Sequence, residues 1–480
     1  MRQSMNKEQT LKLLGDYNQQ YILDHYYRLN LEEKGDFLKE LKGLDLALVF
    51  ELYRKFAQEK DFSRPFYEIH PAPIITILET AREKTRQQEA RILGESLIRK
   101  NEIAVLIVAG GQGSRLGFEG PKGEFRISPV TQKSLFQLFA ESVKALANRY
   151  QAMIPLLIMT NQENQQETQQ FFEAHNFFNL DRKTLYFFNQ GMLPTLTPEG
   201  QLILKNNTQL LVNPDGHGGS LKALFETGFL QHLIDKGFSE LFYCQVDNPL
   251  VKIADPVFIG YHKMEGAEIS TKVVRRQEPD EKVGVYGFVN GKSTIVEYSD
   301  FRTEDYKALD EKGAIRHWAG NTAIHMISLS FVQRLNQHGF ALPYHRAVKE
   351  VEGQGRDGLE AKMIGWKFET FVFDSIPLAR KACCMEVIRE EEFAPVKNRQ
   401  GKDSPDTARA AMIQLHRSWL KEAGARLAPE VRVEVSPLFA LDGEELIAKL
   451  KGKKLIIKED KYLASVVRSC RRAKMLGKKR

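Results

Sequence analysis

A glycine-rich segment that follows an apolar run is the first part of the chain whose residue types could do chemistry. Residues 109–125 read "AGGQGSRLGFEGPKGEF" and continue from "IAVLIVA". Glycine has no Cβ and tolerates positive φ, so such a turn lets the backbone approach a ligand closely. Arg115 adds a planar guanidinium and Lys122 an ammonium group, and both could bind a polyphosphate. The segment predicts phosphate binding, with a surface turn of solvated cations as the alternative.

Two common phosphate motifs do not fit this segment. Gly111 and Gly113 begin a GxGxxG pattern, but Leu116 stands where its third glycine belongs, and no acid follows at the proper strand end. The GK[ST] ending of a P-loop is also missing. The segment alone therefore leaves the kind of phosphate ligand open.

A carboxylate follows a second apolar run. "YCQVDNPLVKIADP" places Asp247 directly after a predicted strand. Mg²⁺ prefers a carboxylate together with phosphate oxygens, which a bound nucleotide would offer. The alternative is an aspartate that closes a turn by bonding its own backbone.

Two further segments carry candidate binding groups. The second glycine-rich turn, "NPDGHGGSLKAL" at residues 213–224, contains His217 and leads into a predicted helix, so its N–H groups could meet a base, a sugar or a phosphate. A structural hydrogen bond is the commoner role for a loop histidine. Lys397 in "FAPVKN" follows the acidic "REEEF", where a solvent-facing salt bridge is equally consistent with the pattern.

The pattern of apolar residues indicates an α/β protein. Residues 1–100 are predicted to be helical, with Asn30 capping a helix through Glu33 and a later helix over residues 73–100. From Ile103 short apolar runs alternate with amphipathic ones, as in a largely parallel sheet that becomes mixed further along the chain. Ligands of such sheets bind at the carboxyl ends of the strands. We predict domains at 1–100, 101–396 and 397–480.

Composition excludes several classes of protein. Hydrophobic residues make up 42% and charged residues 27%, and no apolar run approaches the roughly 20 residues of a membrane-spanning helix. The start of the chain lacks the apolar stretch of a signal peptide, so we expect a cytoplasmic protein. Cys244, Cys383, Cys384 and Cys470 form no zinc or disulfide pattern.

The net charge of +7 comes from the end of the chain. Residues 468–480 carry seven positive charges and no acid, so the rest of the chain is close to neutral. We expect a solvated terminus, with docking of this tail on nucleic acid as a less favoured alternative.

The order of the segments resembles a known family. The matching segments are "AGGQGSRLG..PKGEF", "FFNQGMLP", "PDGHGG", "YCQVDNPLVKIADPVFIGY", "KVVRRQEPDEKVGV", "IVEYSD", "AGNTAIH", "KFETFVFD" and "VIREEEFAPVKN". Together they resemble the eukaryotic-type UDP-N-acetylglucosamine pyrophosphorylases, within the UDP-sugar pyrophosphorylase (UDPGP) family.

The resemblance implies a fold and a reaction. The fold is a nucleotidyltransferase (GT-A/Rossmann-like) central domain with a mixed sheet, an N-terminal helical domain and a small C-terminal α+β domain. The reaction joins UTP and N-acetylglucosamine 1-phosphate to UDP-N-acetylglucosamine and pyrophosphate. The sugar phosphate attacks the α-phosphorus in line, so the protein mainly positions groups and neutralises charge.

The resemblance also implies roles for individual residues. Arg115, Lys122 and Lys397 would be catalytic, the first two on the triphosphate and the third near the reacting phosphates, and Asp247 would help to bind Mg²⁺. The uridine would be surrounded by Gly110, Gly111, Gln190 and Gly216. The sugar would lie against His217, Gly284, Glu297, Asn321, Phe371 and Phe373, with the two phenylalanines beside its acetamido group.

Two residues bear on the choice of sugar. Asparagine is usual at the position of His217 in N-acetylglucosamine enzymes, whereas a Gly-His-Gly turn is typical of UDP-glucose and broad UDP-sugar pyrophosphorylases. Arg115 in "GSRLG" favours the N-acetylglucosamine branch. A UDP-glucose or broad-specificity enzyme is therefore the alternative, and a non-catalytic nucleotide-sugar binding protein is the alternative of a different class.

Overall fold

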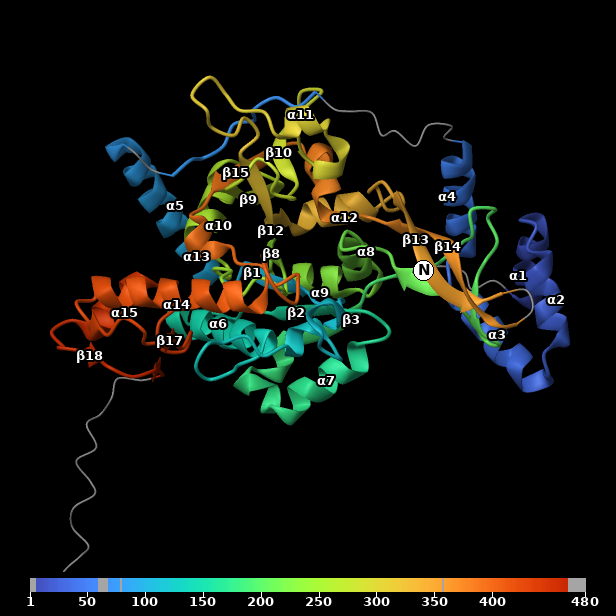
Figure 1. Cartoon of the computed structure of the whole chain (residues 1–480), viewed down its shortest axis with the longest axis horizontal. Helices are drawn as coiled ribbons and strands as arrows, with labels where there is room; N and C mark the ends of the chain where they lie inside the picture. Colours follow the sequence, from blue (N-terminus) through green and yellow to red (C-terminus); the bar gives the residue numbers. More distant parts are fainter. Residues whose placement is uncertain (1–5, 59–67, 78–79, 356–357, 465–480) are drawn as a thin grey trace, which may run out of the picture.

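A computed structural model describes residues 6–58, 68–77, 80–355 and 358–464 (Figure 1). Its centre is a nine-stranded mixed sheet with the strand order β11-β10-β12-β8-β1-β2-β3; in addition, β9 pairs with β12, and β15 pairs with β9. The basic tail at 468–480 and Cys470 lie outside the described residues. The strands of this sheet are β1 (Ile103–Val108), β2 (Leu156–Thr160), β3 (Leu185–Asn189), β8 (Glu240–Gln245), β9 (Ile269–Arg275), β10 (Val285–Val289), β11 (Lys292–Val296), β12 (Ala319–Ser328) and β15 (Ala382–Glu386).

The predicted change from a parallel to a mixed sheet is confirmed. Strands β3, β2, β1 and β8 are parallel to one another, and β15 is parallel to β9. Strand β12 runs antiparallel to both β8 and β9, and β10 forms an antiparallel hairpin with β11. The carboxyl ends of β1, β2, β3 and β8 therefore lie at one edge of the sheet, where α/β proteins bind ligands.

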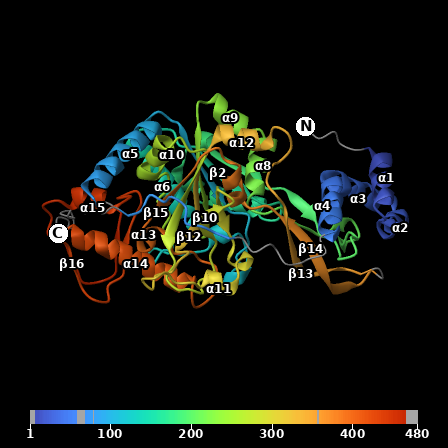
Figure 2. The same ribbon diagram turned by 90° about the horizontal axis from the view of Figure 1, so that it is seen from above.

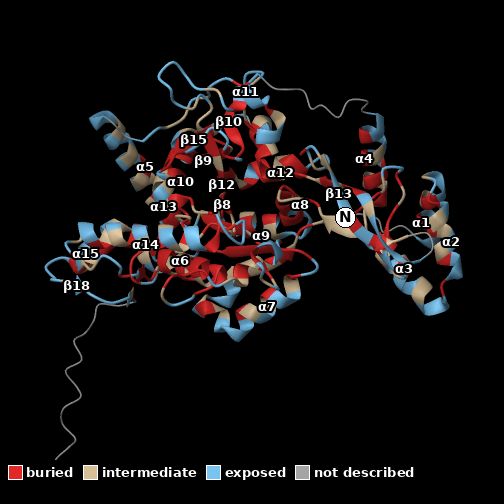
Figure 3. Cartoon of the chain, viewed as in Figure 1, coloured by how far each residue is buried: buried red, intermediate tan, exposed pale blue. Residues whose placement is uncertain are grey.

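Both faces of the sheet are covered, which explains its continuous apolar strands. Alternate residues of β1 enter different cores: Val105 and Ile107 lie in one, and Ala104 and Leu106 in the other. The first core contains helices α5 (Ala81–Arg99), α6 (Leu135–Tyr150), α10 (Pro256–Met264) and α14 (Pro405–Glu422), and the second contains α8 (Gly219–Glu226), α9 (Phe229–Asp235) and α12 (Leu329–Asn336). Figure 3 shows the buried sheet between helices whose outer faces are exposed.

Helix α5 begins later than the sequence indicated. The predicted helix over 73–100 is wrong at its start, because Thr80 and Glu83 form a capping box and the helix begins at Ala81. The backbone N–H of Ile75 instead donates to the carbonyl oxygen of Cys384 at 2.9 Å, so this apolar stretch extends along β15. The capping box that was predicted, between Asn30 and Glu33, is confirmed at the start of α3 (Leu31–Gly43).

The N-terminal helices share a core with segments from far along the chain. Phe37 and Phe50 pack in one cluster with Leu196, Trp366 and Phe368. Figures 1 and 2 show this part at one end of the molecule. It comprises α1 (Lys7–Asp16), α2 (Gln20–Arg28), α3, α4 (Leu46–Gln58), β4 (Met192–Pro194), β5 (Leu204–Asn206), β6 (Gln209–Leu210), β7 (Val212–Pro214), β13 (His345–Gln354) and β14 (Glu360–Glu369).

The C-terminal part lies at the other end (Figure 2). It has its own small core, which includes Leu420, Val433, Leu446 and Ile457. Its elements are α14, α15 (Gly443–Leu450), β16 (Arg426–Leu427), β17 (Val433–Val435), β18 (Ile456–Ile457) and β19 (Lys461–Leu463). The three predicted domain ranges stay a prediction.

The remaining helices are short or lie at the edges of these parts. They are α7 (Gln165–Ala174), α11 (Thr303–Tyr306) and α13 (Arg389–Glu392). Across the described ranges, no helix is both long and apolar enough to cross a membrane. Cys244, Cys383 and Cys384 are buried free thiols.

Candidate active site

The glycine-rich segment after β1 forms a closed loop. The backbone N–H of Gly113 donates to the carbonyl oxygen of Gly120 at 2.9 Å, and that of Lys122 donates to Gly111 at 3.0 Å. Between them, Gly117 and Gly120 have φ values of 71° and 121°, which residues with a Cβ rarely adopt. These glycines let the loop fold tightly at the carboxyl end of β1, as the sequence suggested.

Lys122 and Asp247 meet at this edge of the sheet. The Lys122 Nζ lies 3.3 Å from the Asp247 Oδ2, and the two side chains are 16% and 13% exposed. Asp247 comes two residues after β8, which pairs directly with β1. The parallel pairing of the two strands therefore explains why residues 125 positions apart come together.

The segment that carries Lys397 is attached to the same place. The backbone N–H of Val396 donates to the carbonyl oxygen of Asp247 at 2.8 Å. Lys397 is exposed one residue later, and Arg115 is exposed on the 3₁₀ turn Ser114–Leu116 of the glycine loop. Among the predicted catalytic residues, the structure thus brings Lys122 into contact with Asp247, and it attaches the Lys397 segment to the backbone of Asp247.

The predicted uracil-reading glutamine lies against the start of the glycine loop. A Cβ built on Gly110 would lie 3.2 Å from the Gln190 Nε2, so the glutamine amide packs directly on the glycine. Gln190 is buried, and its N–H donates to the carbonyl oxygen of Thr160 at 2.9 Å. Gly111 is exposed, and a Cβ there would meet no other atom within 4 Å, which leaves open space beside the loop.

Two asparagines that the sequence analysis did not single out hold this strand end in place. The Asn161 Nδ2 donates to the carbonyl oxygen of Gly110 at 2.7 Å, and the Asn164 Nδ2 donates to that of Ala109 at 3.3 Å. Both side chains are buried. Both residues follow β2. Polar residues directly after an apolar strand are the sequence pattern from which they could have been predicted.

The second glycine-rich turn packs against the segment of Phe371 and Phe373. Gly216 has a φ of 86°, and a Cβ there would collide with the backbone of Thr370. The His217 ring lies 5.3 Å from the Phe371 ring and 5.8 Å from the Phe373 ring, between centroids. The Val372 N–H donates to the His217 Nδ1 at 3.2 Å. His217 is therefore part of the predicted sugar wall.

Burial keeps His217 neutral. It lowers the pKa of His217 to about 4, although the nearby Asp247 carboxylate opposes this shift. At neutral pH the ring is therefore uncharged, and because its Nδ1 accepts the Val372 N–H, its Nε2 is the N–H donor.

The wall formed by Phe371 is supported from another side by a second histidine. The His345 ring stacks on Phe371 at 4.8 Å, and Phe371 stacks on Phe373 at 5.2 Å. The His345 Nε2 lies 2.7 Å from an Asp374 carboxylate oxygen. This hydrogen bond limits rotation of the His345 ring and so supports the orientation of Phe371.

The three remaining residues of the predicted sugar site lie together. The Asn321 N–H donates to the carbonyl oxygen of Gly284 at 2.8 Å, and a Cβ on Gly284 would lie 2.9 Å from the Glu297 Oε1. Strand β12 has a register shift between Asn321 and His325, and Ala323 there has a φ of 57°. Such bulges redirect side chains next to active sites.

Few side chains at this site could serve as ligands of a metal ion. Within the described chain, no three His, Cys, Asp or Glu side chains gather where they could hold a metal ion. Asp247 offers one carboxylate at the edge of the sheet. This donor set fits Mg²⁺ that takes most of its ligands from substrate phosphates and water, as it commonly does.

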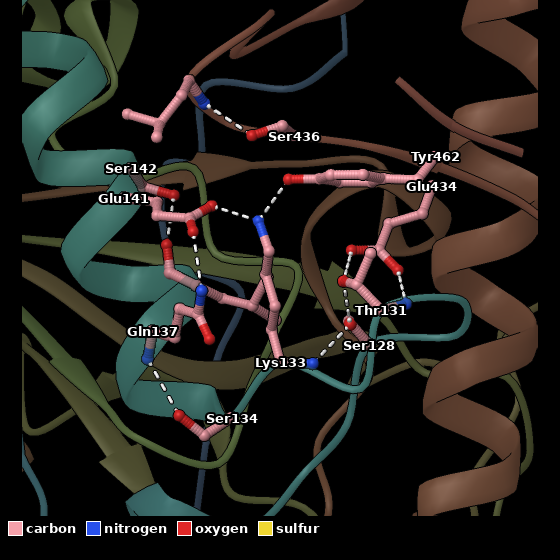
Figure 4. Close-up of polar contacts among 12 residues, drawn as sticks. Ser128, Thr131, Lys133, Ser134, Gln137, Glu141, Ser142, Glu434, Ser436 and Tyr462 are labelled. Atoms are coloured by element: carbon pink, nitrogen blue, oxygen red, sulfur yellow. Dashed lines mark hydrogen bonds and ion pairs between the residues drawn. The ribbon is translucent and has the colours of Figure 1, made fainter. Parts of the chain in front are cut away.

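The C-terminal part holds the hairpin that follows the glycine loop (Figure 4). The Glu434 carboxylate accepts hydrogen bonds from the N–H groups of Val130 and Thr131, both at 2.8 Å. The buried Lys133 ammonium lies 2.5 Å from Glu141 and donates to the Tyr462 hydroxyl at 2.5 Å. Residues 128–133, which follow Lys122 closely, are therefore fixed by contacts from β17 and β19.

Comparison with known proteins identifies the family. The family model described as UTP–glucose-1-phosphate uridylyltransferase (UDPGP) matches residues 49–451. The chain belongs to this family. The UDPGP fold therefore provides the glycine loop, the strand ends and the mixed sheet described above, and the predicted resemblance is confirmed.

Several members of the UDPGP family are similar over most of their length. UDP-N-acetylglucosamine pyrophosphorylase from Saccharomyces cerevisiae is 37% identical over 400 residues, which cover 80% of this chain and 83% of the yeast protein. A probable UDP-N-acetylglucosamine pyrophosphorylase from Dictyostelium discoideum is 32% identical, with 92% and 95% covered.

Solved structures agree with the predicted fold class. The crystal structure of uridine diphosphate N-acetylglucosamine pyrophosphorylase from Trypanosoma brucei is similar with a TM-score of 0.79 and 28% identity, over 96% of this chain and all of that one. A UDP-glucose pyrophosphorylase from Leishmania major has a TM-score of 0.55 at 18% identity, over 77% of each chain, and so shows the shared fold alone. The predicted nucleotidyltransferase architecture is confirmed.

Proposed function

We propose that this UDPGP family member transfers uridylate from UTP to N-acetylglucosamine 1-phosphate, giving UDP-N-acetylglucosamine and pyrophosphate. The Lys122–Asp247 pair beside the closed glycine loop carries the proposal, because a cation and a carboxylate that could ligate Mg²⁺ lie together at one edge of the sheet. The choice of sugar rests on relatives 32–37% identical whose names specify N-acetylglucosamine.

The residues of the loop suit an in-line transfer. An oxygen of the sugar phosphate would attack the α-phosphorus of UTP, forming one P–O bond while the bond to pyrophosphate breaks. Lys122 and Arg115 would neutralise the charge that develops on the departing pyrophosphate. Bound Mg²⁺ would supply further charge neutralisation at the phosphate oxygens, with Asp247 as its protein ligand. Lys397 would approach the phosphate of the sugar, since its segment is attached to the backbone of Asp247.

The substrates would be positioned by groups on either side of this centre. The Gln190 amide packs on Gly110, where it could pair with the donor and acceptor groups of uracil. Phe371, Phe373 and His217 would contact the sugar on one side, and Gly284, Glu297 and Asn321 would contact its hydroxyl groups on another. These positions, the Mg²⁺ requirement and the cytoplasmic location stay predictions.

A UDP-glucose or broad UDP-sugar enzyme is the second candidate, because His217 lies in the predicted sugar wall. A panel of sugar 1-phosphates with UTP and Mg²⁺, scored by pyrophosphate release, separates the two candidates. A pure nucleotide-sugar binding protein would release no pyrophosphate with any sugar. The Lys122–Asp247 pair argues against such a protein, because binding alone does not require charge neutralisation of a leaving group.

A further inference from the structure

The loop after Lys397 is compact and fixed at both ends. The N–H groups of Lys397 and Asn398 both donate to the carbonyl oxygen of Asp403, at 2.7 and 2.9 Å. The Asn398 Nδ2 donates to the carbonyl oxygen of Lys402 at 2.8 Å. Because Val396 is bonded to the backbone of Asp247, this loop has a defined position beside the carboxyl end of β8.

The loop places Arg399 against the glycine loop. A Cβ built on Gly117 would lie 3.2 Å from the Arg399 Nε and 3.3 Å from its Cζ. Gly117 ends the 3₁₀ turn that carries Arg115. The guanidinium of Arg399 therefore lies on the backbone of the loop, at a position where the glycine leaves room for it.

Three of the four cations named beside the glycine loop lack carboxylate partners. Within the described ranges, none of Arg115, Lys397 and Arg399 forms an ion pair with an Asp or Glu side chain, and Lys122 pairs with Asp247 alone. Exposed arginines elsewhere do find partners, as Arg432 does with Asp460 at 2.5 Å. Several uncompensated positive charges beside one glycine loop favour a ligand with several negative charges.

We propose that Arg399 is a further phosphate-binding residue, whose guanidinium binds the terminal phosphates of UTP and the departing pyrophosphate. This inference rests on the proposed function. Lys122 and Asp247 are half-buried at the ends of β1 and β8, whereas Arg399 is exposed on the far part of the loop near Gly117. A triphosphate that extends outward from the strand ends along the loop would bring its terminal phosphates to Arg399. Guanidinium groups bind phosphates through two parallel hydrogen bonds, which suits this position.

The test compares binding of UTP, pyrophosphate and UMP to the full chain by calorimetry. We expect Arg399→Ala to weaken the binding of UTP and pyrophosphate about tenfold or more, because a charge-assisted hydrogen bond is lost. The affinity for UMP should stay within about twofold of the wild-type value. Arg399→Lys keeps the charge and should recover part of that loss. The matched control is Arg426→Ala, which removes an exposed arginine from β16 of the C-terminal part and should change none of the three affinities.

Three results would overturn the inference: unchanged UTP affinity in Arg399→Ala, an equal loss for UMP, or no recovery in Arg399→Lys. The inference fails separately from the proposed function. If the wild-type protein releases no pyrophosphate with any sugar phosphate, the proposed reaction is wrong, but the comparison of UTP with UMP still tests whether Arg399 binds the terminal phosphates.

Discussion

Lys122 Nζ lies 3.3 Å from Asp247 Oδ2, although 125 residues separate the two in the sequence. The contact exists because β1 and β8 are neighbouring parallel strands: Asp247 closely follows β8, and the glycine loop after β1 brings Lys122 back to the same edge through the bond from its N–H to the carbonyl oxygen of Gly111. A cation and a carboxylate held in this way can act together on a phosphate group and a metal ion.

Removal of the Lys122 ammonium should slow the chemical step. We expect Lys122→Ala to lower kcat/KM for UTP by about 100-fold, since the loss of one group that stabilises developing charge costs on the order of 10²–10³ in rate. Pyrophosphate release measures the effect. Lys236→Ala is the control, because that lysine is exposed at the end of α9. Activity within twofold of wild type in Lys122→Ala would show that the residue has no catalytic role.

Asp247 should determine the response to metal. We expect chelation of divalent cations to abolish pyrophosphate release, and Asp247→Asn to raise the Mg²⁺ concentration for half-maximal activity about tenfold, because a neutral amide is a weaker ligand than a carboxylate. A Mg²⁺ titration of both proteins checks this. An identical titration curve for the two proteins would show that Asp247 does not ligate the metal. Activity that survives chelation would show that the reaction requires no divalent metal.

His217 should influence the choice of sugar. Its ring packs on Phe371 and Phe373, so a change in its shape alters the predicted sugar wall directly. We expect His217→Asn to raise the ratio of kcat/KM for N-acetylglucosamine 1-phosphate over glucose 1-phosphate by about three- to tenfold, a range that corresponds to about 1 kcal/mol. KM for UTP serves as the internal reference and should stay nearly constant. An unchanged ratio would assign sugar preference to other residues.

Buried histidines should make the fold sensitive to mild acid. Burial lowers the pKa of His416 to about 4, below its ordinary value of 6.5. Between these pKa values the unfolded state binds the proton and the folded state does not. The contribution of His416 to the free energy of unfolding is therefore fully present above about pH 6.5 and falls as the pH drops toward 4. His217 and His325, with pKa values lowered to about 4 and about 3, act in the same direction.

One substitution isolates the contribution of His416. Urea unfolding of wild type should show a lower free energy of unfolding at pH 5 than at pH 7, and His416→Gln should reduce that difference by about 2 kcal/mol. Exposed His338→Gln is the control and should leave the difference unchanged. If the free energy of unfolding of His416→Gln differs between pH 5 and pH 7 as much as that of wild type does, this histidine takes up its proton in the folded state as well.

The fold could be predicted where local signals agree with long-range packing. Alternating strands and helices indicated the α/β sheet, and Asn30 with Glu33 indicated the start of α3. The predicted start of a helix at residue 73 was wrong, because the apolar stretch around Ile75 pairs with β15, which lies more than 300 positions later in the chain. Local periodicity carries no information about such a partner.

The site was predicted as a set of residue types, and only the structure shows how they touch. The resemblance identified His217 and Phe371, but their ring contact depends on how Gly216 packs against Thr370. The position of Arg399 on Gly117 could not be inferred, because it joins two loops that are each irregular. Asn161 and Asn164 were missed because their effect on Gly110 and Ala109 is a hydrogen bond to backbone, which leaves no motif.

The assigned reaction is tested most directly by pyrophosphate release from UTP and Mg²⁺ with equal concentrations of four sugar phosphates: N-acetylglucosamine 1-phosphate, N-acetylgalactosamine 1-phosphate, glucose 1-phosphate and galactose 1-phosphate. We expect release that depends on the sugar phosphate and is fastest with N-acetylglucosamine 1-phosphate. Faster release with glucose 1-phosphate would contradict the assigned sugar, and no release with any of the four would contradict the assigned reaction.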